Sequence, residues 1–337
     1  MSCPSPAPTP GPNGSRPPVS DRSRLLADVL TSAGYADWQA TPLPADASRR
    51  RYLRLTKGAE TRIVMDAPPE ATESLDAFLR IGAHLRRLGL AAPDVLHADV
   101  RNGILILEDL GPTQAARHLD TCPSDEAEIY EATAALLAAL QDAPPPPGLA
   151  TLDPATGVAM LAPFFAHAVP DPARRAAIAE TLDTAMEAHA GGPMVLSLRD
   201  FHAENLIWRP DRTGTDRLGL LDFQDAFLAP PAYDLASLLD DVRRDVSPET
   251  EARTLATFAR LTETDPETLA AARAVLSVQR NLRILGVFAA LIAGGKPRYR
   301  AFLPRLRRHL RRQLSHPALD GLRPHVVPLL AEEAAWA

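Results

Sequence analysis

The sequence predicts an α+β chain in which a small, β-rich part is followed by a larger, mainly helical part. Residues 51–56 and 62–66 have strand character and are joined by a turn at residues 57–58. A helix with apolar residues at three- and four-residue intervals follows, and residues 104–107 then form another strand. This strand runs into the polar segment 108–111, after which helical spacing dominates.

Local signals place the remaining elements. Residues 25–33 have helical spacing, and Gly34 is suited to end that helix because glycine readily adopts the left-handed conformation. Residues 125–141 form a strongly amphipathic helix, which the prolines at 144–147 cannot continue because proline lacks a backbone donor. Three short strands are expected in the second half, at residues 194–196, 206–208 and 218–221.

We therefore expect a tail and two lobes. The tail covers residues 1–20, which are crowded with Pro, Ser and Gly and are expected to be disordered. The N-lobe covers residues 21–111 and the C-lobe residues 112–337, with the boundary at the polar segment that ends in Gly111.

The composition indicates a cytoplasmic protein. The chain has 337 residues, 46% of them hydrophobic, and only two cysteines, which fits a reducing compartment. Its amino terminus lacks the basic start and apolar run of a secretory signal. The longest uncharged apolar run, residues 284–295, is shorter than the roughly 20 residues that cross a membrane. A net charge of −6 argues against nucleic acid as the main partner.

Polar residues at fixed spacing point to phosphoryl transfer. Asp200 and Asn205 have the aspartate, four residues, asparagine spacing of a kinase catalytic loop, and Asp222 ends an apolar strand seventeen residues later. A carboxylate that orients the acceptor hydroxyl and accepts its proton is the catalytic group that this chemistry needs, so we assign that role to Asp200. Hard oxygen ligands must also hold Mg²⁺ against the nucleotide phosphates, and we assign Asn205 and Asp222 to the metal.

Each of these residues taken alone is more often an ordinary loop or cap residue. The full pattern is harder to obtain by accident, because an Asp-x4-Asn loop between strands is followed by a strand-terminal aspartate. The combination therefore favours a functional site over three unrelated loop residues.

The stretch Leu-Leu-Asp-Phe-Gln-Asp-Ala-Phe-Leu-Ala-Pro-Pro-Ala-Tyr-Asp-Leu-Ala-Ser-Leu-Leu, residues 220–239, resembles the aminoglycoside phosphotransferase family. This resemblance implies the two-lobed, protein-kinase-like fold, with a nucleotide-binding N-lobe and a C-lobe that carries the catalytic loop and the substrate site. Choline-kinase and sugar-kinase relatives share the strand-end aspartate and the Tyr-Asp-Leu-Ala at residues 233–236. We expect Asp234 to be a helix cap that supports the catalytic loop.

Within this family, three segments resemble the anomeric N-acetylmuramate and N-acetylglucosamine kinases of cell-wall recycling. They are Asp-Ala-Ser-Arg-Arg-Arg-Tyr at residues 46–52, Val-Met-Asp-Ala-Pro-Pro-Glu at residues 64–70, and the Asp-Phe-Gln-Asp-Ala that begins at Asp222. The similarity covers roughly residues 25–315. It implies an enzyme that uses ATP and Mg²⁺ to phosphorylate the anomeric hydroxyl of an amino sugar.

The nucleotide site departs from the kinase pattern. The strand that usually carries a phosphate-binding lysine reads Arg-Ile-Val-Met-Asp at residues 62–66, and Leu198 replaces the catalytic-loop histidine. Arg50 is our candidate for the missing cation, because an arginine fork binds phosphate oxygens well, and Ser48 could donate to phosphate as well. The alternative is that the arginines at 49–51 are a solvated charge run. For adenine we expect the backbone of Glu108 to Leu110 to serve.

The charge of the carboxyl-terminal part bears on the acceptor. Eleven Lys and Arg and no acidic residue lie between residues 268 and 319, whereas a polycationic aminoglycoside would require acidic groups. Helical spacing places Arg280 and Arg283 on one helix, and we expect one of them, with Arg283 as the choice, to bind the lactyl carboxylate of N-acetylmuramate. His202 and Gln224 are candidates for a sugar hydroxyl. The alternatives are a packing or capping role for His202 and a solvent-exposed basic face, which we favour for the arginines at 307–312.

Other functions stay open at this point. Asp240, Asp241 and Asp245 could bind a cationic acceptor, although the adjacent Arg243 and Arg244 make local ion pairs the stronger expectation. The acceptor could instead be an aminoglycoside or a choline-like alcohol, or the chain could be a nucleotide-binding pseudokinase. A nucleic-acid surface is unsupported because aromatic residues are nearly absent from the basic stretch, and no obligate protein partner is evident.

Overall fold

The computed structural model describes residues 21–43, 50–69 and 75–331, and the chain divides into two compact units. Unit 1 contains the described residues up to 69 together with residues 96–107. Unit 2 contains residues 75–95 and 108–331. The tail over residues 1–20 and Ser48 lie outside the described residues, and the lobe boundary at residue 111 stays a prediction.

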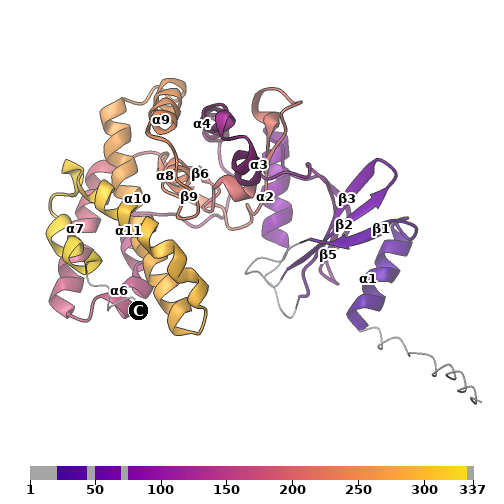
Figure 1. Cartoon of the computed structure of the whole chain (residues 1–337), viewed down its shortest axis with the longest axis horizontal. Helices are drawn as coiled ribbons and strands as arrows, with labels where there is room; N and C mark the ends of the chain where they lie inside the picture. The colour runs from indigo at the N-terminus through magenta and orange to yellow at the C-terminus, as the bar shows by residue number, and fades with distance from the viewer. Residues whose placement is uncertain (1–20, 44–49, 70–74, 332–337) are drawn as a thin grey trace, which may run out of the picture. The chain divides into compact units, whose positions relative to one another are not determined.

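Unit 1 is built on a five-stranded sheet with the strand order β1-β2-β3-β5-β4 (Figure 1). The strands are β1 (Gln39–Pro42), β2 (Arg51–Lys57), β3 (Glu60–Asp66), β4 (Val95–Asp99) and β5 (Ile104–Glu108). The predicted antiparallel pair β2 and β3 is confirmed, as is β5. The sequence missed β1, which is four residues long with every residue exposed, and β4, in which no residue is buried.

Helix α1 (Asp21–Ser32) covers a face of this sheet. Its Val29 is buried together with Leu55, Val64 and Ile104 from three strands. At the end of β3, buried Asp66 accepts a hydrogen bond of 2.9 Å from Arg22 Nε and one of 2.6 Å from Arg51 Nη2, while Met65 is fully buried. The strand that lacks the kinase lysine therefore ends in a carboxylate that ties α1 and β2 to β3.

Unit 2 is mainly helical. Its helices are α2 (Asp76–Arg87), α3 (Ala115–Thr121), α4 (Glu126–Gln141), α5 (Pro154–Ala159), α6 (Ala162–Ala168), α7 (Pro172–His189), α8 (Tyr233–Leu239), α9 (Pro248–Leu261), α10 (Pro266–Ala293), α11 (Leu303–Leu314) and α12 (Arg323–Val326). Single 3₁₀ turns are η1 (Pro123–Asp125), η2 (Ala203–Asn205), η3 (Gly214–Arg217), η4 (Pro297–Phe302), η5 (Pro317–Leu319) and η6 (Val327–Leu330). Two antiparallel ladders pair β6 (Val195–Ser197) with β9 (Phe227–Ala229) and β7 (Leu206–Trp208) with β8 (Leu218–Leu220).

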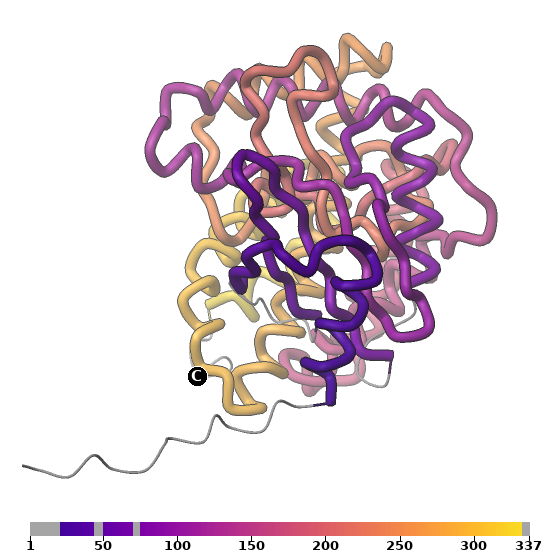
Figure 2. Tube along the Cα trace, turned by 90° about the vertical axis from the view of Figure 1, so that its right-hand side faces the viewer, coloured from indigo at the N-terminus to yellow at the C-terminus, as the bar shows by residue number. Residues whose placement is uncertain are grey.

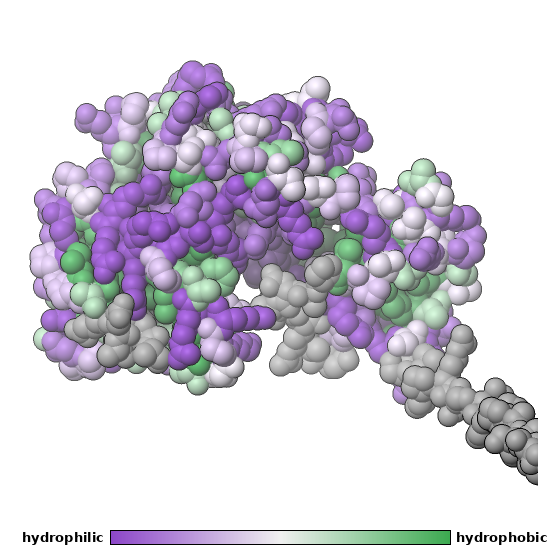
Figure 3. Space-filling model, in the orientation of Figure 1, coloured by the Kyte–Doolittle hydropathy of each residue, from purple (hydrophilic) through white to green (hydrophobic). Residues whose placement is uncertain are grey.

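Helix α10 is the central helix of unit 2. It packs against α6, α7, α8 and α11, and the orange-to-yellow trace in Figure 2 follows α10 into α11. By length and composition alone α10 could cross a membrane, but 61% of its most apolar stretch is buried inside the protein. Most side chains on the face of unit 2 drawn in Figure 3 are hydrophilic. The apolar residues of α10 are therefore those of a core helix.

A glycine allows α10 to approach α6 closely. A Cβ atom at Gly286 would lie 2.1 Å from the backbone nitrogen of Phe164 and 2.4 Å from the carbonyl carbon of Pro163. Both contacts are with backbone, so a rotamer change cannot relieve them. We expect Gly286→Ala to lower the free energy of unfolding by about 3 kcal/mol in urea titrations, because overpacking forces the two helices apart.

Gly321 provides the matched control for this substitution. A Cβ atom there would meet only Thr181 Cγ2, at the ordinary contact distance of 3.8 Å. Gly321→Ala should therefore change the free energy of unfolding by less than about 1 kcal/mol. Equal effects of the two substitutions would contradict the close packing of α10 on α6.

Candidate active site

The backbone of unit 2 brings the two candidate metal ligands together. In the β7–β8 hairpin Leu206 pairs with Leu220, and beyond this pair the amide of Leu221 donates to the carbonyl of Asn205 at 2.9 Å. Asn205 thus precedes β7 and Asp222 follows β8 at the same end of the hairpin. Asn205 is half-buried and Asp222 is exposed, so the Asp222 carboxylate is open to a ligand.

Hydrogen bonds fix the orientation of the Asn205 amide. Its Nδ2 donates to the backbone carbonyl of Asp200 at 2.9 Å and lies 3.3 Å from His202 Nε2. Because both contacts use the amino group, Oδ1 is left as the atom that can hold a cation. The Asp200 carbonyl bond also ties the asparagine to the catalytic loop that carries the candidate base.

Two residues of the site have a left-handed backbone. Among the described non-glycine residues, only Arg199 (φ 69°), Asp222 (φ 55°) and Glu263 (φ 52°) have positive φ. Arg199 immediately precedes Asp200, and such backbone strain costs about 1–3 kcal/mol per residue. Phe223, the residue after Asp222, is buried and stacks on Phe78 of α2 with ring centroids 4.9 Å apart. This packing helps to stabilise the backbone conformation of Asp222.

Asp234 holds the start of the catalytic loop. Its carboxylate accepts hydrogen bonds from Ser197 Oγ at 2.7 Å, from the Leu198 amide at 2.7 Å and from the Arg199 amide at 3.1 Å. Burial raises the pKa of Asp234 to about 6, while these hydrogen bonds act in the opposite direction. The prediction that Asp234 caps a helix is wrong, because Asp234 lies inside the first turn of α8. Its carboxylate oxygens accept hydrogen bonds from the catalytic loop, so the predicted support of that loop is confirmed.

Asp200 is half-buried at the tip of this loop. Its amide donates to the carbonyl of Leu198 at 2.8 Å, so the loop turns sharply at this residue. Among the described residues no side chain forms an ion pair or hydrogen bond with the Asp200 carboxylate. The carboxylate is therefore available to an acceptor hydroxyl.

His202 is buried behind this loop. The side chain is 5% exposed, and burial lowers its pKa to about 4, so the imidazole is neutral at pH 7. Its contact with Asn205 makes Nε2 an acceptor. This placement gives His202 a role in positioning Asn205, while the sugar contact expected from the sequence stays a prediction.

The depressed pKa of His202 makes stability depend on pH. Between about pH 4 and 6.5 the unfolded chain binds a proton at this residue that the folded chain does not, so the free energy of unfolding falls as the pH is lowered. The full effect of His202 is about 3 kcal/mol. We expect urea titrations at pH 7, 6 and 5 to show a smaller acid loss for His202→Gln. Parallel curves for the two proteins would contradict the burial of a neutral imidazole.

Of the other residues expected to contact substrate or nucleotide, Gln224 lies beside Asp222 and the rest lie elsewhere in the chain. Gln224 Nε2 donates to Asp222 Oδ1 at 2.7 Å, and Arg283 lies on α10, where burial lowers its pKa. Arg50 is a buried residue of unit 1. The Glu108 amide already donates to the Asp94 carbonyl at 2.8 Å, and Leu110 is buried. The structure thus gathers Asp200, His202, Asn205, Asp222 and Gln224 in one loop and hairpin of unit 2.

The acidic cluster of the sequence is neutralised by arginines. Asp241 pairs locally with Arg243 at 3.0 Å, as expected. Asp245 pairs instead with Arg305 and Arg308 of α11, and buried Asp240 pairs with Arg273 and Arg312. The expected solvent-exposed basic face is confirmed for Arg308, Arg311 and Arg312, although Arg308 and Arg312 also form these ion pairs. Sequence spacing cannot reveal these pairs because the partners are 33 to 72 residues apart.

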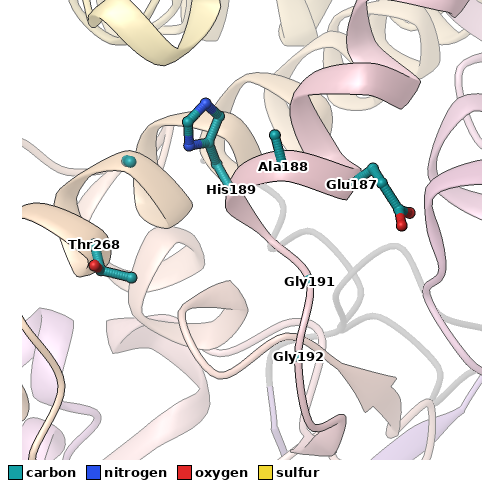
Figure 4. Close-up of a pocket in the computed structure, with 7 residues that line it drawn as sticks. Glu187, Ala188, His189, Gly191, Gly192 and Thr268 are labelled. Carbon is teal, nitrogen blue, oxygen red and sulfur yellow. The ribbon is translucent and has the colours of Figure 1, made fainter.

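Other clusters on unit 2 are separate from this site. One pocket lies between the end of α7 and the start of α10 and is lined by residues such as His189, Gly191, Gly192 and Thr268 (Figure 4). On α3 and the turn after it, ligand atoms of His118, Cys122 and Asp125 lie within 4.8 Å of one another. A 2.7 Å hydrogen bond between His118 Nε2 and Asp125 accounts for that grouping. Neither cluster contains a predicted site residue.

A loop aspartate, a nearby asparagine and a strand-end aspartate on an α+β fold define a protein-kinase-like phosphotransferase. Solved structures agree with the fold. The choline kinase LicA from Streptococcus pneumoniae superposes with a TM-score of 0.64 at 16% identity, over 88% of this chain and all of that one. The α+β, protein-kinase-like fold class predicted from the sequence is confirmed.

Sequence comparison identifies the family. The N-acetylmuramate/N-acetylglucosamine kinase of Caulobacter vibrioides is 38% identical over 90% of this chain and 95% of its own length. The kinase of the same name from Pseudomonas aeruginosa is 32% identical over 85% of this chain and 87% of its own length. The chain belongs to the phosphotransferase enzyme family, whose model matches residues 39–275. The predicted family resemblance is confirmed.

Proposed function

We propose that the chain is an ATP- and magnesium-dependent kinase that phosphorylates the anomeric hydroxyl of N-acetylmuramate and N-acetylglucosamine. The choice of acceptor rests on sequence similarity to two kinases over nearly the whole chain. The Caulobacter vibrioides and Pseudomonas aeruginosa relatives are both N-acetylmuramate/N-acetylglucosamine kinases, and they cover 90% and 85% of this chain. A cytoplasmic location, where ATP is available, fits the low cysteine content.

Asp200 is the proposed catalytic residue. Its carboxylate, which no described side chain pairs with, orients the anomeric hydroxyl and accepts its proton as the hydroxyl oxygen forms a bond to the terminal phosphorus of ATP. The bond between that phosphorus and the bridging oxygen breaks, and ADP leaves with the electron pair. This transfer depends on positioning more than on covalent help from the protein, which is why a fixed loop matters.

Asn205 and Asp222 are the proposed metal ligands. The Asn205 amino group is committed to Asp200 and His202, which leaves its oxygen for a cation, and the Asp222 carboxylate is exposed beside it. Oxygen donors of this kind suit Mg²⁺. When bound there, Mg²⁺ neutralises charge on the nucleotide phosphates. Gln224 restrains the Asp222 carboxylate through its 2.7 Å hydrogen bond.

The nucleotide requires residues that bind its phosphates and its adenine. We assign phosphate binding to Arg50 and Ser48, and adenine binding to the backbone of Glu108 and Leu110. At Glu108 the carbonyl would serve, because the amide is already hydrogen-bonded to Asp94.

The charge distribution disfavours a polycationic acceptor. Each member of the acidic cluster, Asp240, Asp241 and Asp245, pairs with at least one arginine. An aminoglycoside would have to displace these arginines to use the carboxylates. A choline-like acceptor meets the same difficulty because it is also a cation.

ADP release measured with a coupled assay tests the proposal. The purified chain with ATP and Mg²⁺ should turn over both N-acetylated sugars but neither kanamycin nor choline. The methyl glycoside of N-acetylglucosamine is the matched control, because only its anomeric hydroxyl is blocked, and it should be inert. Phosphorus NMR should show coupling between phosphorus and the anomeric proton. Turnover of the methyl glycoside would reject anomeric transfer, and ATP binding without turnover of any acceptor would favour a pseudokinase.

A further inference from the structure

Helix α10 carries a buried arginine that forms no ion pair with a described side chain. Arg280 is 2% exposed, and its Nε and Nη1 atoms have no hydrogen-bond partner among the described residues. A guanidinium remains charged at any working pH, so burying it without an acceptor costs folding free energy.

The same helix contains a buried arginine that is fully paired. Arg273 is 5% exposed, and its terminal nitrogens contact Asp240 at 3.1 Å and Glu251 at 2.7 Å. Asp234 attracts Arg280 electrostatically. However, both Asp234 oxygens already accept hydrogen bonds from the catalytic loop. Arg280 therefore lacks the kind of partner that Arg273 has.

Two more unsatisfied donors lie beside Arg280. Arg283 follows it by three residues, which places both on the same face of α10, and the Arg283 Nε atom is buried without a partner among the described residues. The Tyr233 hydroxyl, from α8, is also buried and has no described partner. Helices α8 and α10 pack together, and both guanidinium charges act on the Tyr233 hydroxyl. The three donors are therefore neighbours.

Tyr233 lies near the catalytic loop, because its ring packs against Phe227 with centroids 5.1 Å apart and the Arg199 guanidinium lies 6.0 Å from the same Phe227 ring. The charge of Asp200 acts on both Tyr233 and Arg283. Arg199, next to Asp200, has a further buried Nε atom without a described partner. An anion bound at these donors would therefore lie near the loop that carries Asp200.

We propose that Arg280, together with Arg283 and the Tyr233 hydroxyl, forms a subsite that binds the carboxylate of the acceptor sugar. This inference rests on the proposed function. Of the two acceptors only N-acetylmuramate has a carboxylate, on its lactyl group, and a guanidinium fork matches a carboxylate with two parallel hydrogen bonds. The subsite therefore makes the enzyme prefer N-acetylmuramate to N-acetylglucosamine.

Arg280→Met tests this subsite, because methionine has a similar length but no charge. The KM for N-acetylmuramate should rise by about 10- to 100-fold, the value of a charge-assisted hydrogen bond, while the KM for N-acetylglucosamine changes by less than about threefold. The Tm should stay the same or rise, because a buried unpaired charge has been removed. Arg273→Met is the matched control, and its Tm should fall because Asp240 and Glu251 lose a partner.

Two outcomes would overturn the subsite. One is an unchanged KM for N-acetylmuramate in Arg280→Met. The other is an equal rise in KM for both sugars, which would mean that Arg280 acts on the transferred phosphoryl group or stabilises the fold. If the wild-type chain phosphorylates neither sugar, the proposed function fails separately. Calorimetry with N-acetylmuramate and its neutral methyl ester then decides the subsite. The wild type should prefer the acid and Arg280→Met should not, whereas a wild type without this preference contradicts the inference.

Discussion

Asp200→Asn is expected to lower kcat at least about 1,000-fold with little change in the KM for the sugar. The amide can still accept a hydrogen bond from the anomeric hydroxyl, but it cannot take the proton as the bond to phosphorus forms. The fold should be unaffected, because no described side chain pairs with the Asp200 carboxylate and the loop is held through its backbone and Asp234. Steady-state kinetics and thermal unfolding on the same preparation check both halves of this expectation.

Asp211→Asn is the matched control for this change. Asp211 is exposed in the loop between β7 and β8, so the same replacement there should leave kcat within about twofold. If Asp200→Asn retained more than about a tenth of the wild-type kcat, Asp200 would be excluded as the main base. A parallel fall in Tm would show a structural role instead.

Asp240→Asn is expected to produce the largest loss of stability, about 3–5 kcal/mol in urea titrations. Asp240 is 1% exposed and accepts hydrogen bonds from Arg273 at 3.1 Å, Arg312 at 2.6 Å and Gln313 at 3.2 Å. Burial raises its pKa, but Arg273, His309 and Arg312 outweigh that effect and hold the pKa below its usual range. Without this charge, buried Arg273 keeps only Glu251 as a partner.

Asp245→Asn distinguishes a buried ion pair from an exposed one. The Asp245 side chain is 57% exposed although it also pairs with two arginines, Arg305 and Arg308. Because solvent screens such pairs, Asp245→Asn should cost less than about 1 kcal/mol. If Asp240→Asn cost no more than Asp245→Asn, burial of the Asp240 network would not determine the stability of unit 2.

Sequence spacing predicted the part of the site that is local in the chain. Asp200 and Asn205 belong to one loop, and Asp222 is joined to them by a single hairpin whose strand β7 was predicted at its observed bounds. Residues of one loop and one hairpin lie close together irrespective of how distant segments of the chain pack. The same is true of β2, β3 and the pair formed by Asp241 and Arg243.

Features that depend on distant partners could not be predicted. The role of Asp234 required its contact with Ser197, 37 residues away, and the Asp66 carboxylate is met by Arg22, 44 residues away. Periodicity placed Arg280 and Arg283 together on a helix, but only packing shows that Arg280 is the more buried of the two. Strand β9, at residues 227–229, was not predicted.

The central claim is that Asp200, Asn205 and Asp222 form a single phosphoryl-transfer site. A crystal structure of the chain with Mg²⁺, a non-hydrolysable ATP analogue and N-acetylmuramate tests it most directly. We predict Mg²⁺ bound by the Asn205 and Asp222 side-chain oxygens, with the anomeric hydroxyl hydrogen-bonded to the Asp200 carboxylate. Magnesium held by other residues, or an anomeric hydroxyl beyond hydrogen-bond reach of Asp200, would contradict the claim.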